Sequence, residues 1–292
     1  MRESTNEPSH DLTLVGDIIA MLPNLSIIIL DVTGNRYSST KPGTFPSSVL
    51  LSTPVNLKVV YCFQFYVVPH RADWLSFLSS RPHLRSISDF DPRDTIRKLQ
   101  PIPDLSSLTS IHLSYSWTHW LLQFVELPNV QHLTYLIDDP LHRYRSPGTL
   151  FRQLGVQLRS LAVNFPTPWM IDLISKTCPN LVTLELIVEN WTDLTTGITG
   201  DITQDITTFP TVNLIKVACR KLQSKSASYS HMFRFIVQAK TICPTLKTVR
   251  LSDERNVASL KTHPRLLRDR LEVLWATGVA LEDAEGRLLH PG

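Results

Sequence analysis

A nine-residue stretch occurs twice in the chain with the same arrangement of proline and aliphatic residues. Cys178-Pro-Asn-Leu-Val-Thr-Leu-Glu-Leu186 and Cys243-Pro-Thr-Leu-Lys-Thr-Val-Arg-Leu251 both have the form Pro-x-Leu-x-x-aliphatic-x-Leu. In a strand, the residues three and five positions after the first leucine share one face, because side chains alternate with period two. The motif therefore predicts a turn that leads into a strand with one buried face.

Ten positions fit the first leucine of this motif when an aliphatic residue is also required three positions later. They are Leu25, Leu57, Leu84, Leu108, Val130, Leu158, Leu181, Leu214, Leu246 and Leu271. Their spacings of 22 to 33 residues are typical of solenoids, in which each unit buries its apolar face against its neighbours. Five positions after the anchor, only Asp89 breaks the pattern. We therefore predict an α/β solenoid of about ten irregular units, with parallel strands on one face and helices on the other.

The predicted solenoid covers residues 12–276, between a disordered N-terminus at residues 1–11 and a C-terminal tail or cap at residues 277–292. Apolar periodicity places helices at residues 12–22, 72–80 and 232–242. Predicted strands include residues 57–66 and, as the last one, residues 271–275. Residues 189–210 are expected to form an irregular insertion, and the basic, serine-rich residues 220–230 a mobile segment.

Composition excludes several classes of protein. The formal net charge is only +3, which gives no overall attraction for nucleic acid or membrane surfaces. No apolar run is long enough for a transmembrane helix, and no secretory signal is visible. The four cysteines occupy small apolar positions of the repeat and form no Cys-x-x-Cys pair, so neither a disulfide nor a metal role is expected. A reducing setting follows, and we expect a cytoplasmic or nuclear protein.

The sequence carries no constellation that predicts catalysis. It has no glycine-rich phosphate loop, no Gly-x-Ser-x-Gly and no His-Glu-x-x-His. The ten histidines are scattered, and a lone histidine such as His119 between two aromatic neighbours is more often a packing feature than a ligand. We therefore expect a protein that is not an enzyme and that needs no cofactor and no metal ion.

The open face of the strands is the candidate binding surface. Positions two, four and six after each anchor point away from the helices. Aromatic and basic side chains are the usual anchors of protein interfaces, which selects Tyr61, Phe63, Phe90, His112, His132, Lys216, Arg220 and Arg250. A second interpretation stays open for the apolar N-terminal end of this face, which an additional N-terminal element could cover.

Two further stretches, Arg81-Pro-His-Leu-Arg-Ser-Ile and Leu127-Pro-Asn-Val-Gln-His-Leu, align with the repeated motif. Together they make the chain resemble the leucine-rich-repeat region of fungal F-box-like proteins, over about residues 15–276. The resemblance implies a leucine-rich-repeat-like solenoid and the substrate receptor of a ubiquitin ligase, in which an F-box docks on the ligase adaptor and the repeats hold the substrate. An F-box pattern is not found in this sequence, and the Asn or Cys expected eight positions after the anchor is replaced, for example by Thr33 and Glu189.

These observations predict a non-catalytic protein-binding repeat domain, and the resemblance adds the role of a substrate receptor. The partner is expected to be a protein, with an acidic surface to match the basic end of the strand face. A ligase adaptor would bind only if an F-box preceded the repeats. The alternatives are a stand-alone interaction scaffold unrelated to ubiquitin, and weak nucleic-acid binding through Lys216, Arg220, Lys221, Lys225 and Arg250; membrane binding is not expected.

Overall fold

The computed structural model describes residues 9–30, 43–44, 47–62, 67–68, 71–89, 103–114, 127–137, 147–164, 166–198, 208–222 and 226–290. Packing divides the chain into two compact units, Met1–Val130 and Gln131–Gly292. Both units alternate strands with helices, and within each unit every pairing between named strands is parallel. The predicted α/β class with parallel strands is therefore confirmed, whereas the division into two units was not expected.

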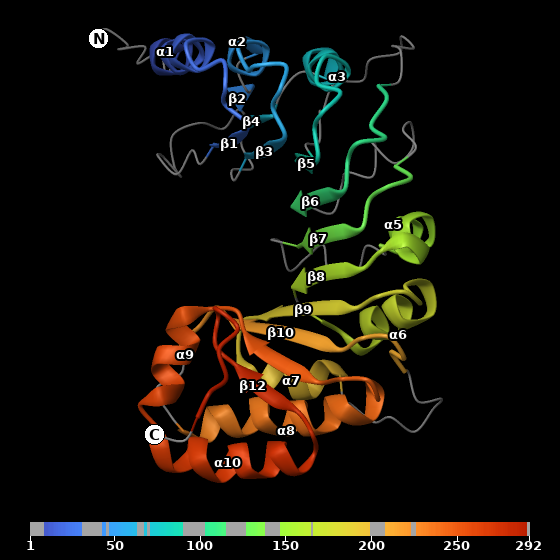
Figure 1. Ribbon diagram of the computed structural model, residues 1–292, viewed down its shortest axis with the longest axis vertical. Coiled ribbons are helices and arrows are strands. Elements are labelled where there is room, and N and C mark those ends of the chain that lie inside the picture. Colours follow the sequence, from blue (N-terminus) through green and yellow to red (C-terminus); the bar gives the residue numbers. More distant parts are fainter. Residues whose placement is uncertain are drawn as a thin grey trace, which may run out of the picture. The chain divides into compact units, whose positions relative to one another are not determined.

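The first unit builds a parallel sheet in the order β1-β3-β5-β6 (Figure 1). Each strand pairs with the next of these strands along the chain, as in a solenoid. A short parallel pair, β2 with β4, is separate. The elements are α1 (Ser9–Ala20), β1 (Ile27–Leu30), β2 (Gly43–Thr44), α2 (Ser47–Leu51), β3 (Val59–Cys62), β4 (Val67–Val68), α3 (Arg71–Ser79), β5 (Ser86–Asp89) and β6 (Ser110–Ser114).

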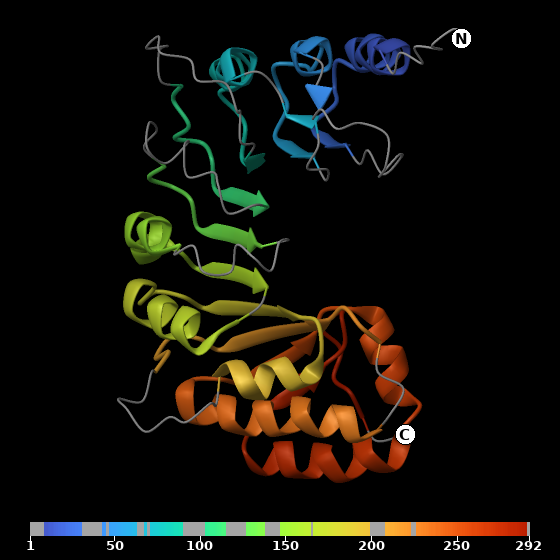
Figure 2. The ribbon, with the colours of Figure 1, turned by 180° about the vertical axis from the view of Figure 1, so that it is seen from behind.

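The second unit continues this pattern with strands in the order β7-β8-β9-β10-β11-β12. Its elements are β7 (His132–Leu136), α5 (Gly148–Leu154), η2 (Gly155–Gln157), β8 (Ser160–Asn164), α6 (Pro168–Thr177), β9 (Thr183–Val188), α7 (Trp191–Ile198), β10 (Leu214–Cys219), α8 (Ser226–Ile242), β11 (Thr248–Leu251), α9 (Glu254–Lys261), α10 (Pro264–Ala276) and β12 (Ala280–Glu282). Helices α7, α8 and α10 lie along one side of this sheet (Figure 2), which leaves its other face open.

One column of aliphatic side chains runs through each sheet. Strand pairing places the residues three positions after eight of the anchors, together with Ile215 and Leu281, opposite one another on neighbouring strands within each unit, and every member is at most 6% exposed. The column is Ile28, Val60, Ile87 and Ile111 in the first unit, and Leu133, Leu161, Leu184, Ile215, Val249 and Leu281 in the second. The expectation that Leu184 is buried on the helix-covered face is confirmed.

Polar side chains just before the anchors connect each turn to the turn before it. The Thr211 hydroxyl donates to the carbonyls of Pro179 and Leu181, at 3.0 and 2.8 Å. One repeat later, the Thr245 hydroxyl donates in the same way to Pro210 and Val212, at 2.9 Å each. Because these carbonyls lie in turns rather than in the strand ladder, the hydroxyls satisfy acceptors that would otherwise need water.

Two buried asparagines hydrogen-bond the backbone groups of the preceding repeat where its strand ends. The Asn164 amide accepts from the Ile137 backbone N–H at 2.6 Å and donates to the Ile137 carbonyl at 2.7 Å. The Asn256 amide pairs in the same way with both backbone groups of Cys219, at 2.8 and 2.9 Å. Both asparagines are 1% exposed. An amide from the following repeat thus satisfies the backbone where β7 and β10 end.

A buried arginine ties α2 to the turn that follows α3. Arg81 is 5% exposed, and its guanidinium donates to the carbonyls of Leu50, Leu51 and Thr53. The same group lies 5.0 Å from the centroid of the Phe77 ring. These carbonyls end α2, where backbone acceptors lack helical partners, so Arg81 acts as a side-chain cap inside the core.

The predicted register was wrong at two of the ten anchors. On β10 the residue that aligns with Leu184 is Ile215, so the anchor is Val212 and not Leu214. Residues 271–275, predicted as the last strand, lie in α10, because Leu-x-x-Leu also suits one face of a helix. The last strand is β12, inside the segment predicted as a tail or cap, and it pairs with β11.

Three boundaries also differ from the prediction. Helix α1 begins at Ser9, inside the segment predicted to be disordered. The expected irregular insertion at residues 189–210 contains α7, and the segment predicted to be mobile at residues 220–230 includes the first turn of α8. Residues 63–66 of the predicted second strand lie outside the described part of the chain.

Candidate binding surface

The open face of the second unit carries a row of charged side chains that strand pairing aligns. Glu185 on β9 lies opposite Lys216 on β10, Lys216 opposite Arg250 on β11, and Arg250 opposite Glu282 on β12. All four side chains are half-buried. We refer to Glu185, Lys216, Arg250 and Glu282 as the charged row; its two carboxylates and two cations give it no net charge.

The interactions within the charged row are unequal. Arg250 donates from Nε and Nη2 to Glu282 Oε2, at 2.9 and 2.7 Å. Glu185 Oε1 accepts from the Ser252 hydroxyl at 2.9 Å. Lys216 makes no ion pair and no side-chain hydrogen bond with any residue that the structure describes. Lys216 is therefore the member of the row that can receive an anionic group without displacing an existing partner.

A glycine allows the Arg250–Glu282 pair to form. Gly286 has a φ of +83° in the turn after β12. A Cβ atom at this position would lie 2.8 Å from Arg250 Nη2, so a side chain here would strain the backbone and push the guanidinium aside. No sequence pattern indicated this contact, because it joins a strand to a segment predicted as a tail.

The two other predicted residues of the second unit lie outside the charged row. Arg220 follows the end of β10, is exposed, and pairs with Glu189 at 3.3 Å between Nη1 and Oε1. His132 is exposed on β7. Of the three basic residues proposed as an anion-attracting end, two are thus already paired with carboxylates. This pairing weakens the predicted basic patch.

In the first unit, Tyr61 and His112 meet over small side chains. Their ring centroids lie 6.0 Å apart at an interplanar angle of 73°, although β5 runs between their strands. Ser86 and Ser88 on β5 are 8% and 1% exposed, and the Ser86 and Tyr61 hydroxyls share a hydrogen bond. Serine leaves room for both rings to lean across β5, so this part of the open face is partly closed by its own side chains.

Burial changes the acid–base behaviour of His112. Desolvation lowers its pKa from 6.5 to about 4, because the charged imidazolium loses more solvation than the neutral ring. His112 is therefore neutral at physiological pH. A neutral, half-buried imidazole packed against a tyrosine suits a contact surface better than a site for binding anions.

Apolar side chains flank this aromatic pair. Ile27 and Ile29 on the open face of β1 are 54% and 58% exposed, and Ile29 lies opposite Tyr61. Phe63 and Phe90, also predicted for this surface, lie outside the residues that the structure describes. The structure thus brings together Tyr61 with His112, and Lys216 with Arg250.

Two acidic residues of the surface were missed by sequence reasoning. Glu185 was placed on the open face but not selected, because the choice favoured aromatic and basic residues. Glu282 was missed because β12 was predicted to be a tail. Alternation of Ala280, Leu281 and Glu282 after a glycine turn was the available signal, although three residues define a strand poorly.

The described residues contain no cluster of side chains that could hold a metal ion and no helix that could span a membrane. Among them, no three His, Cys, Asp or Glu side chains are placed to share a metal ion. None of the described helices combines the length and hydropathy that a membrane span requires. Cys178, Cys219 and Cys243 are buried free thiols, and burial raises their pKa values to about 11, 11 and 12, which keeps them protonated and unreactive.

The sequence matches no protein-family model, and a search of curated proteins finds no match.

Proposed function

We propose that this protein is a non-catalytic binding domain of the leucine-rich-repeat type, whose open strand face holds a protein partner. The observation that carries this proposal is the charged row, in which four side chains from four successive strands present a half-exposed, aligned surface. Helices occupy the other side of the sheet, so the row has room for a partner.

The chemistry of the row favours a protein over nucleic acid. Phosphate backbones are bound through unpaired cations, whereas Arg250 and Arg220 are each paired with a carboxylate. The row has no net charge, and Lys216 alone offers an unpaired cation in it. We therefore expect a partner that places one carboxylate at Lys216 and complements Glu185 and Glu282 with donors.

The resemblance to F-box-like proteins supports a narrower proposal, in which the bound protein is a ubiquitin-ligase substrate. A ligase adaptor would be recruited by an F-box preceding the repeats, in a protein of the cytoplasm or nucleus. A stand-alone scaffold with the same strand face is the second candidate. Co-purification of the full-length natural protein with the ligase adaptor separates the two, since only the receptor retains the adaptor.

A charge-reversal pair tests the proposed binding face. The protein is immobilised and exposed to an extract of its source cells, and captured proteins are quantified by mass spectrometry. Lys216→Glu should reduce capture of the specific partner at least tenfold, because a like charge at an interface costs several kcal/mol and about 1.4 kcal/mol already changes Kd tenfold. The matched control is Lys247→Glu, at an exposed lysine immediately before β11. Equal capture by the wild type and both variants would contradict this binding face.

Salt dependence tests the nucleic-acid alternative. Binding of a labelled single-stranded oligonucleotide should be weak and non-specific at physiological salt. A tight complex whose affinity falls steeply with salt, and which Lys216→Glu and Arg250→Glu weaken, would favour nucleic acid over protein as the ligand.

A further inference from the structure

A groove of about 320 Å³ lies between α9 and the turn that follows β12. Glu254, Val257, Ala258 and Lys261 line one wall; they are three or four residues apart and therefore share one face of the helix. The opposite wall is formed by Asp283, Ala284, Glu285 and Arg287. The groove is separate from the charged row and includes none of its members.

The turn that forms the second wall is held rigidly. Asp283 is 6% exposed, and its Oδ1 accepts from the backbone N–H groups of Glu285 and Arg287, at 3.0 and 2.9 Å. Arg287 Nε donates to Asp283 Oδ2 at 2.9 Å, and Arg287 Nη2 pairs with Glu285 Oε2 at 2.6 Å. Gly286 supplies the positive φ that closes the turn. The wall is thus pre-organised, which reduces the entropic cost of binding.

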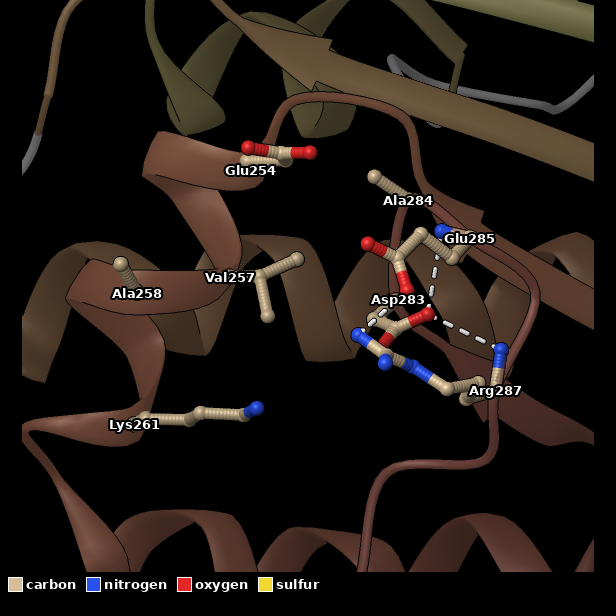
Figure 3. Close-up of a pocket in the computed structure, with 8 residues that line it drawn as sticks. All are labelled: Glu254, Val257, Ala258, Lys261, Asp283, Ala284, Glu285 and Arg287. Carbon is tan, nitrogen blue, oxygen red and sulfur yellow. Dashed lines mark hydrogen bonds and ion pairs between the residues drawn. The ribbon is translucent and has the colours of Figure 1, made fainter.

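The two ends of the groove carry opposite charge. At one end Glu254 faces the turn in which Arg287 is already shared by Asp283 and Glu285, so carboxylates outnumber cations there. At the other end, Lys261 makes no ion pair or side-chain hydrogen bond within the described parts of the chain. Figure 3 shows Glu254 and Lys261 at opposite ends of α9, with Val257 between them.

The separation of the two ends defines the spacing of a ligand. Glu254 and Lys261 are seven residues apart on α9, which corresponds to about 10 Å along the helix axis. A polyproline II segment places side chains i and i+3 on the same side, about 9 Å apart. Val257 on one wall and Ala284 on the other provide apolar surface that the methylene stem of a long basic side chain can contact.

We infer that this groove is a second binding site, which takes an extended segment of a protein partner carrying a basic residue and an acidic residue three positions apart. The basic side chain lies at the Glu254 and Glu285 end, and the carboxylate pairs with Lys261. The site is independent of the proposed strand-face function and persists if that function is wrong.

Calorimetric titration at low salt tests the proposal with four capped tetrapeptides. The probe is Arg-Pro-Pro-Glu; Arg-Pro-Pro-Arg and Glu-Pro-Pro-Glu vary the charge, and Pro-Arg-Glu-Pro keeps the composition but makes the charges adjacent. The wild-type protein should bind Arg-Pro-Pro-Glu most tightly. If Arg-Pro-Pro-Glu binds no better than the other three peptides, the proposal is wrong.

Charge reversal in the protein locates the binding. Lys261→Glu should raise the Kd for Arg-Pro-Pro-Glu about tenfold and make Arg-Pro-Pro-Arg the preferred peptide. Lys261→Gln, which removes the charge without adding a new one, should raise the Kd less. The control Lys216→Glu, in the charged row, should leave the Kd unchanged. If Lys216→Glu weakens binding as much as Lys261→Glu does, the peptide binds the strand face and the groove proposal fails.

Discussion

The open faces of the two units carry different kinds of side chain, although both cover the same kind of aliphatic core. In the second unit, the row formed by Glu185, Lys216, Arg250 and Glu282 is charged, and strand register pairs Arg250 with Glu282. In the first unit, the equivalent row holds Ile29, Tyr61, Ser88 and His112, and Tyr61 reaches His112 across the serines of β5. Beneath both faces lies the same aliphatic column. The repeat therefore fixes the buried face and leaves the open face free to differ.

This difference separates what stabilises the fold from what can bind. Ion pairs on an exposed sheet contribute little to stability, so the charged row can change without loss of the fold. The Tyr61–His112 pair is partly buried, and its removal exposes Ser86 and Ser88. We therefore expect substitutions on the first unit's open face, including at Tyr61, to lower stability more than substitutions on the second unit's open face.

The largest expected effect tests whether the two units share one kind of core. Leu184→Ala in the second unit and Ile87→Ala in the first should each lower the free energy of unfolding by roughly 2–5 kcal/mol, through lost burial and the cavity left behind. Chemical denaturation measures both, with Thr183→Ala as a half-buried control on the open face. A loss below about 0.5 kcal/mol for Leu184→Ala would show that the repeat register is wrong.

The buried guanidinium of Arg81 should contribute more to the free energy of unfolding than the half-buried guanidinium of Arg250. Arg81→Met keeps much of the side-chain volume but removes the guanidinium hydrogen bonds to the carbonyls of Leu50, Leu51 and Thr53, of which Leu50 keeps the N–H and hydroxyl of Thr53. It should cost about 1–3 kcal/mol. Arg81→Lys keeps a positive charge but lacks the planar guanidinium with its several N–H donors. It should therefore lose less stability than Arg81→Met. Unchanged stability in Arg81→Met would mean that water replaces the guanidinium at the end of α2.

On the open face of the first unit, His112 should make the free energy of unfolding depend on pH. The pKa of His112 is lowered from 6.5 to about 4 in the folded protein, so the unfolded chain takes up a proton first as the pH falls. Its contribution is complete above pH 6.5 and is lost between pH 6.5 and 4, by on the order of 3 kcal/mol. Denaturation curves at pH 7, 5.5 and 4 measure it.

Two variants control the histidine experiment. His112→Phe should remove most of the loss between pH 6.5 and 4, because it leaves no proton to bind there. His132→Phe, at an exposed position on β7, should leave the loss unchanged. Equal slopes for the wild type and His112→Phe would assign the pH dependence to other groups.

The smallest expected effect concerns the ion pair of the charged row. Arg250→Met should cost about 1 kcal/mol, and the exchange of both charges, Arg250→Glu with Glu282→Arg, should restore part of it. A double-mutant cycle gives the coupling energy. A cost above that of Arg81→Met would reverse the comparison between buried and half-buried cations.

The sequence predicted the buried face far better than the open one. The aliphatic column follows from a motif repeated in one chain, and eight of its ten anchors align in the structure. The error at Leu214 is a shift of two residues, which keeps every side chain on its face, so Lys216 was still placed correctly. The error at Leu271 has a different cause. Leu267, Leu271 and Leu274 are buried on one side of α10, and Leu-x-x-Leu alone does not distinguish a helix from the start of a strand.

Contacts between strands could not be predicted in the same way. The pairing of Arg250 with Glu282 depends on β12 following α10, and the closeness of Tyr61 to His112 depends on the small side chains between them. The groove beside α9 is formed by α9 and the turn after β12, and no local sequence pattern predicts that these two segments meet. Each of these depends on tertiary placement, which the motif constrains only at the start of each strand.

The hydrogen bonds of the Thr211 and Thr245 hydroxyls indicate where this chain can accept inserted loops. Each links its own turn only to the turn before it, so these bonds align neighbouring strands at the end where the strands begin. Within the returns that run from the end of one strand to the next turn, Asn256 of α9 adds a further link, to the end of β10. Loops grafted into these returns away from Asn256, for example to display a foreign epitope, should leave the order of the strands intact.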